Sequence, residues 1–181
     1  MLSDTRFVLG VGVGHLHPEF EALGTPMAGR GPLADEILDA MGSLWFDDAP
    51  EMEGEFIRFN GVHAYPRPEK VPIIVGGRSP AAYRRAVGRG HGFYGWMLDP
   101  EATGAALEQL SEAAKSVERP DHLGRLEISV TPPVPVDLDL AERYASLGVD
   151  RLIVAPGREA DEVNIMELIE RVGTDFIPRF G

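Results

Sequence analysis

The residues with the clearest chemical potential are the four consecutive residues Gly76-Gly77-Arg78-Ser79. Glycine has no Cβ, so a ligand oxygen can come close to the backbone, and positive φ angles are accessible there. The guanidinium of Arg78 can add a forked, charge-assisted contact to a phosphate group. The same residues would also make an ordinary turn between a strand and a helix, with Arg78 in solvent, and this short motif leaves both interpretations open.

The segments on either side of this motif predict a strand, a tight turn and a helix. The apolar run 73–75 is typical of a strand, Ser79 is a good N-cap, and Pro80 suits the first position of a helix over 80–89. Such a unit places backbone N–H groups at the carboxyl edge of a parallel sheet, where the positive end of the helix dipole favours an anion. We therefore predict a phosphate site at residues 76–79.

A second glycine-rich loop follows the apolar run 6–11, which predicts a strand buried on both faces of a parallel sheet. Gly12 and Gly14 lie in this loop and allow the backbone to approach something flat or bulky. His15 follows directly, and an imidazole can donate or accept a proton near neutral pH. The sequence is also consistent with His15 as an exposed loop histidine without a chemical role.

A competing phosphate site lies near the carboxyl end of the chain. There the apolar run 151–155 predicts a strand, and Pro156-Gly157-Arg158 follow it. In eight-stranded α/β barrels the loops after the last two strands often hold phosphate. We rank Gly157 and Arg158 second because no helix begins directly after them.

The remaining patterns predict an α/β fold with about five parallel strand-plus-helix units. Strands are expected near residues 6, 73, 92, 127 and 151, and Asn60-Gly61 predicts a small β-hairpin insertion. Apolar residues at helical spacing predict helices over 33–45, over 80–89, after Asp99-Pro100, over 138–147, and at a final stripe of Ile165, Leu168, Ile169 and Val172. We expect residues 1–181 to form a single domain.

Composition disfavours several classes of function. The chain has no cysteine, 17 Lys and Arg against 29 Asp and Glu, and a net charge of −12. The lack of cysteine rules out a disulfide framework and a thiolate metal site, and the negative charge disfavours nucleic-acid partners. No apolar run approaches the ~20 residues of a membrane span, and the first residues do not resemble a leader. We therefore expect no membrane partner and a cytoplasmic protein.

Several further segments occur in an order and spacing that is shared with one protein family. They are Arg6-Phe-Val-Leu-Gly-Val-Gly12, Glu19-Phe-Glu-Ala-Leu-Gly24, Glu53-Gly-Glu-Phe56, Pro66-Arg-Pro68, Pro72-Ile-Ile-Val-Gly-Gly77, Arg85-Ala86 and Gly92-Phe93. Together they resemble the bacterial luciferase-like monooxygenase family, and within it the branch that uses the deazaflavin coenzyme F420. The resemblance implies a partial (β/α)8 TIM barrel in which residues 6–11 correspond to the fourth strand, so that the first three units of a relative would precede Met1. Relatives usually carry an aspartate where His91 stands.

The resemblance also implies a function. It implies an oxidoreductase that uses coenzyme F420 or FMN for hydride transfer or monooxygenation of a small organic substrate. The phosphate tail would lie at residues 76–79 and the ring beside Gly12, Gly14 and His15. No residue is assigned a catalytic role, no metal is expected, and we expect a homodimer.

Alternative interpretations remain open at the level of sequence. Three descriptions of the chain compete. The first, which we favour, is a fragment of a longer enzyme. The second is a natural reduced barrel that dimerises to cover itself, and the third is a relative that no longer catalyses. A non-catalytic protein that binds a flavin-like molecule is a second class of function. A metal-dependent hydrolase is a third, suggested only by the five histidines His15, His17, His63, His91 and His122.

Overall fold

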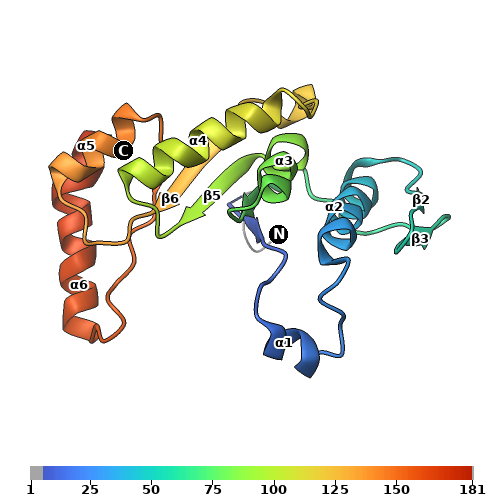
Figure 1. Cartoon of the computed structure of the whole chain (residues 1–181), viewed down its shortest axis with the longest axis horizontal. Coiled ribbons are helices and arrows are strands. Elements are labelled where there is room, and N and C mark those ends of the chain that lie inside the picture. The colour runs from blue at the N-terminus through green and yellow to red at the C-terminus, as the bar shows by residue number, and fades with distance from the viewer. Residues whose placement is uncertain (1–5, 181) are drawn as a thin grey trace. The chain divides into compact units, whose positions relative to one another are not determined.

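The structure is a computed structural model, and it describes residues 6–180. Within this range it contains one parallel sheet with the strand order β1-β4-β5-β6-β7 and one antiparallel pair, β2 and β3 (Figure 1). The chain divides into two compact units: the first comprises Met1–Phe93 and Gln109–Leu126, and the second comprises Tyr94–Glu108 and Glu127–Gly181. The predicted α/β class, the five parallel strands and the small hairpin are confirmed.

The elements have the following bounds. The strands are β1 (Leu9–Val11), β2 (Met52–Glu53), β3 (Arg58–Phe59), β4 (Ile73–Gly76), β5 (Gly92–Trp96), β6 (Glu127–Thr131) and β7 (Arg151–Leu152). The helices are α1 (His17–Ala22), α2 (Arg30–Phe46), α3 (Pro80–Arg89), α4 (Pro100–Ala114), α5 (Leu138–Ser146), α6 (Glu162–Arg171) and α7 (Ile177–Phe180), with a 3₁₀ turn at Asp121–Leu123 and a π-helical turn at Val172–Phe176. Across residues 6–180, no helix combines the length and the apolar character that a membrane crossing requires.

The core of the first unit is built around β4 and α3. Three β4 side chains, Ile73 to Val75, are buried because this strand lies between β1 and β5 in the sheet. Helix α3 presents Ala86, which is fully buried, and Tyr83, whose ring centroid lies 5.5 Å from that of Phe93. Burial of a large apolar side chain contributes about 1.5–3 kcal/mol. The predicted helix over 80–89 is confirmed.

The core of the second unit contains β6 and α5. Val130 and Tyr144 are both fully buried, and the Tyr144 hydroxyl donates a hydrogen bond of 2.6 Å to the carbonyl oxygen of Leu98. Helix α5 begins after Asp137, whose carboxylate accepts the N–H of Leu140 at 2.8 Å. The strand predicted near residue 127 is confirmed as β6, and the predicted helix over 138–147 is present with its end at Ser146.

The prediction that the strand over 6–11 is buried on both faces is wrong. The strand covers only Leu9–Val11, and its side chains are half-buried or exposed. Before it, Phe7 is 53% and Val8 is 42% exposed. The physical reason is position, because β1 stands at the end of the strand order and pairs with β4 alone.

The hairpin is present, but its predicted turn at residues 60–61 is wrong. The strands β2 and β3 are joined by residues 54–57, and the N–H of Gly54 donates to the Ile57 carbonyl at 2.8 Å. The carboxylate of Glu36 on α2 accepts the N–H groups of residues 55–57 at 2.8, 2.8 and 2.9 Å. This tertiary contact places the turn at residues 54–57, before the local Asn-Gly signal.

The carboxyl-terminal elements are shorter or more exposed than predicted. Strand β7 covers only two residues of the predicted 151–155. Helix α6 forms, but Ile165 is 38% and Ile169 is 58% exposed, and none of its residues is buried. Helical periodicity fixes which residues share a face, whereas burial also requires a partner for that face.

Candidate functional site

The candidate site begins where β1 and β4 end side by side in the first unit. In their register Val11 lies opposite Val75. Parallel neighbours end at the same edge of a sheet, so Gly12 and Gly76 lie at adjacent points of that edge. The two predicted glycine loops therefore start next to each other.

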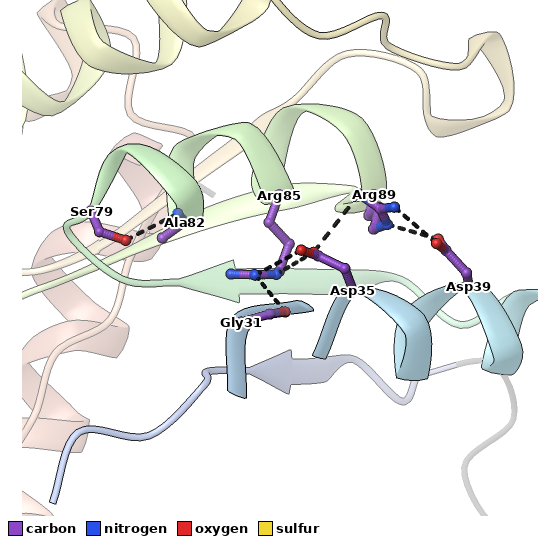
Figure 2. A network of polar contacts seen from close by, with 7 residues as sticks. All are labelled: Gly31, Asp35, Asp39, Ser79, Ala82, Arg85 and Arg89. Atoms are coloured by element: carbon purple, nitrogen blue, oxygen red, sulfur yellow. Dashed lines mark hydrogen bonds and ion pairs between the residues drawn. The ribbon is translucent and has the colours of Figure 1, made fainter. Parts of the chain in front are cut away.

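The strand, turn and helix predicted around residues 76–79 are confirmed. The Ser79 hydroxyl accepts the N–H of Ala82 at 3.2 Å, and Pro80 occupies the first position of α3 (Figure 2). Gly77 has a positive φ of 139°, and a Cβ at this position would lie 2.7 Å from the Cβ of Ala82. The turn itself therefore requires glycine at position 77.

The turn is open to a ligand and carries positive charge. Residues 77–80 are exposed, and the first N–H groups of a helix have no partner within the helix. Burial raises the pKa of the Tyr83 hydroxyl, and the nearby positive charge of Arg78 acts in the opposite direction. Exposed N–H groups beside a guanidinium at a helix N-terminus can hold an anion such as a phosphate.

The loop after β1 combines an open glycine with a constrained one. A Cβ at the exposed Gly12 would meet no atom within 4 Å, so packing within the chain does not explain this glycine. Gly14 has a φ of 74°, and a Cβ there would lie 2.7 Å from the Phe20 ring. Arg30 Nε donates to the Gly14 carbonyl at 3.3 Å and tethers the loop to α2. His15 is exposed and makes no hydrogen bond or ion pair with residues 6–180.

A polar network that the sequence analysis did not single out fixes α3 against α2 (Figure 2). The guanidinium of Arg85, only 4% exposed, contacts both carboxylate oxygens of Asp35 at 2.6 and 3.1 Å and the Gly31 carbonyl at 3.0 Å. One turn further along, Arg89 contacts both oxygens of Asp39 at 2.7 and 2.8 Å. The signal was present in the sequence, because the two aspartates and the two arginines are each spaced four residues apart and so share a helix face.

His91 has a structural role at the other end of β4. Its Nδ1 accepts the N–H of Ile73, the first residue of that strand, at 3.1 Å. Burial lowers the pKa of His91, and the charges of Lys70, Arg119 and His122 act in the same direction. A neutral imidazole that accepts a backbone hydrogen bond explains why histidine can stand here.

The competing loop at residues 156–158 belongs to the second unit and lacks a free helix N-terminus. Helix α6 starts several residues later, and the carboxylate of its N-cap Asp161 accepts the N–H of Asn164 at 2.9 Å. The first turn of α6 is thus already occupied by a negative group. Among the described residues, the histidines and carboxylates form no group of three or more that could hold a metal ion, so the hydrolase alternative gains no support.

Comparison with known proteins decides the family. The model of a family described as luciferase-like monooxygenase matches residues 1–173. The chain belongs to this family. One relative, an uncharacterized protein of Mycobacterium tuberculosis, is 29% identical over 166 residues, which cover 89% of this chain and 57% of the relative. A second uncharacterized protein of Mycobacterium tuberculosis is 31% identical over 152 residues, or 83% of this chain and 49% of the relative. The chain spans about half the length of the curated relatives it matches.

Several solved structures are similar to this chain in fold. An F420-dependent secondary alcohol dehydrogenase in complex with an F420-acetone adduct has a TM-score of 0.67 at 15% identity, with 84% of this chain and 64% of that chain covered. The coenzyme F420-dependent tetrahydromethanopterin reductase from Methanopyrus kandleri has a TM-score of 0.70 at 14% identity, covering 99% and 76%. A monooxygenase from Streptomyces bottropensis has a TM-score of 0.60 at 24% identity, covering 97% and 51%. At these identities the likeness concerns the fold.

Proposed function

We propose that this luciferase-like chain binds the phosphate end of a flavin-type cofactor, coenzyme F420 or FMN, at residues 76–79. The observation that supports this most is the register of β1 and β4, which brings the open Gly12 loop beside the exposed, basic turn at the start of α3. Two of the structural neighbours are F420-dependent enzymes and one is a monooxygenase. The proposed activity is therefore oxidoreduction of a small organic substrate.

The chain's own residues bind and orient the cofactor in this proposal. Backbone N–H groups of residues 77–79 and of Ala81 bind phosphate oxygens, since Pro80 has no N–H and that of Ala82 already donates to Ser79. Arg78 adds a charge-assisted contact. Gly12 and Gly14 allow the ring to lie against the backbone, and the exposed imidazole of His15 can hold or release a proton at its rim. When bound, the cofactor supplies the hydride-transfer or oxygen chemistry itself.

A fluorescence titration of the purified chain with FMN and, separately, with coenzyme F420 tests the binding. We expect saturable binding of one of them near micromolar concentration. Absence of binding by a folded chain contradicts the proposal. Binding without turnover of any small alcohol or carbonyl substrate favours the alternative of a non-catalytic flavin-binding protein.

A charge-matched pair of variants tests the place of the phosphate. Removal of the Arg78 charge in Arg78→Gln should weaken FMN binding about tenfold, because a charge-assisted contact is lost. The control Arg84→Gln removes an equal charge from the exposed face of α3 and should leave the affinity unchanged. Riboflavin, which lacks the phosphate, should bind both variants equally, and an equal loss of FMN affinity in both would place the phosphate elsewhere.

We also expect the chain to form a homodimer, since several apolar side chains of α6 are exposed on the chain alone. Light scattering coupled to gel filtration should then give twice the chain mass of 19.7 kDa. A single-chain mass at micromolar concentration would contradict this expectation.

A further inference from the structure

A single arginine at the start of α2 holds both ends of the segment that carries α1. This segment, residues 15–26, runs from the loop after β1 through α1 towards α2 (Figure 1). Nε of Arg30 donates to the Gly14 carbonyl at 3.3 Å, and Nη1 of the same side chain donates to the Met27 carbonyl at 3.1 Å. Arginine suits this position because its planar fork presents several donors in fixed directions.

The contact with Arg30 is what holds the glycine loop by hydrogen bonding. Within residues 6–180, the Gly14 carbonyl is the one backbone group of residues 13–15 that has a hydrogen-bond partner. The ring of Phe20 also packs on Gly14, since a Cβ there would lie 2.7 Å from it. Gly12 and His15 are exposed. The loop is therefore fixed at Gly14 and open on both sides of it.

The same turn of α2 is linked to α3. The carbonyl of Gly31, the residue after Arg30, accepts Nη2 of Arg85 at 3.0 Å (Figure 2). Asp35, about one turn later, accepts the same guanidinium at 2.6 and 3.1 Å. The start of α2 thus contacts the glycine loop directly through Arg30. It also contacts α3, into which the turn at residues 76–79 leads, through Arg85.

We propose that Arg30 is a positioning residue for the ring of the bound cofactor and acts through the Gly14 carbonyl. This inference rests on the proposed function, which places the ring against Gly12 and Gly14. Ordering a backbone segment costs conformational entropy. A loop that is already held before the ligand arrives therefore binds more tightly than one that the ligand must order. Arg30 itself need not contact the cofactor.

Titrations with two ligands separate this role from phosphate binding. The ligands are whichever of FMN and coenzyme F420 binds the parent chain more tightly, and the same molecule without its phosphate. Arg30→Gln should weaken the binding of both by the same factor, about tenfold, because only the ring side changes. The control Arg58→Gln removes an equal charge from the hairpin, where Arg58 forms an exposed pair with Glu53, and should leave both affinities unchanged.

A conservative variant distinguishes the fork from the charge. Arg30→Lys keeps the positive charge but replaces the planar fork by a single ammonium group. It should bind both ligands about as weakly as Arg30→Gln does. Full recovery of the parent affinity in Arg30→Lys would assign the effect to charge and overturn the proposal.

Backbone ¹⁵N relaxation of the cofactor-free chain tests the loop itself. Arg30→Gln should lower the order parameters of residues 12–15 and leave those of residues 77–82 unchanged, which a general loss of stability would not do. Unchanged order parameters, or an unchanged affinity for the phosphate-free ligand, overturn this proposal and leave the proposed function standing. If the folded parent chain binds neither cofactor, the proposed function fails before any variant is compared, and the inference fails with it.

Discussion

At the scale of residues, the two glycines of the candidate site are glycine for different reasons. Gly77 has a φ of 139°, and a Cβ there would lie only 2.7 Å from the Cβ of Ala82, whereas a Cβ at Gly12 would meet no atom within 4 Å. We expect Gly77→Ala to lower the free energy of unfolding by about 1–3 kcal/mol because of strain, and Gly12→Ala to leave it unchanged. Urea denaturation measures both. Equal stability of the two variants would show that alanine at position 77 does not strain the turn. Because Gly77→Ala is expected to disturb the turn itself, a loss of cofactor binding in this variant would not locate the cofactor.

Gly12→Ala is consequently the cleaner probe of the ring side. It should weaken cofactor binding while the protein stays folded, because a methyl group enters space that packing within the chain leaves open. Gly104→Ala on α4, where a Cβ also meets no atom within 4 Å, is the matched control. If both variants bind the cofactor as the parent chain does, the ring does not lie at Gly12.

At the scale of elements, the contact between α2 and α3 positions the helix whose N-terminus we propose as the phosphate site. Arg85→Gln leaves Asp35 without its buried partner and should destabilise the chain by about 3 kcal/mol. Arg89→Gln breaks the analogous but more exposed pair with Asp39, where the side chains are 37% and 44% exposed, and should cost less than about 1 kcal/mol. Similar unfolding free energies for the two variants would refute this ranking.

The hairpin should respond to acid through Glu36. Loss of hydration raises the pKa of this carboxyl. The hydrogen bonds from the N–H groups of residues 55–57 together lower the pKa by more than this, so the pKa lies below its ordinary value. The charged form is thus favoured in the folded chain, and its contribution is full above the unfolded pKa and disappears as pH falls through the lowered folded pKa. Hydrogen exchange should show the three amides losing protection in that range. Glu36→Gln should lack this pH step, and an identical step in the variant would assign it to another group.

At the scale of the whole molecule, the sequence predicts what local chemistry determines. The β4-turn-α3 unit follows from an apolar run, glycines, an N-cap serine and a proline, and each of these acts within a few residues. The errors concern features that need a distant partner. The burial of β1 depends on its place in the sheet, the hairpin turn depends on Glu36, and the burial of the α6 stripe depends on what packs on it.

The most direct test of the central claim is an amide NMR titration of the ¹⁵N-labelled chain with whichever of FMN and coenzyme F420 binds more tightly. The same molecule without its phosphate serves as the control. We predict that the amides of Gly77, Arg78 and Ser79 shift only when the phosphate is present, while those of Gly12 and His15 shift with both ligands. Binding that leaves residues 77–79 unperturbed and shifts Gly157 and Arg158 instead would contradict the account.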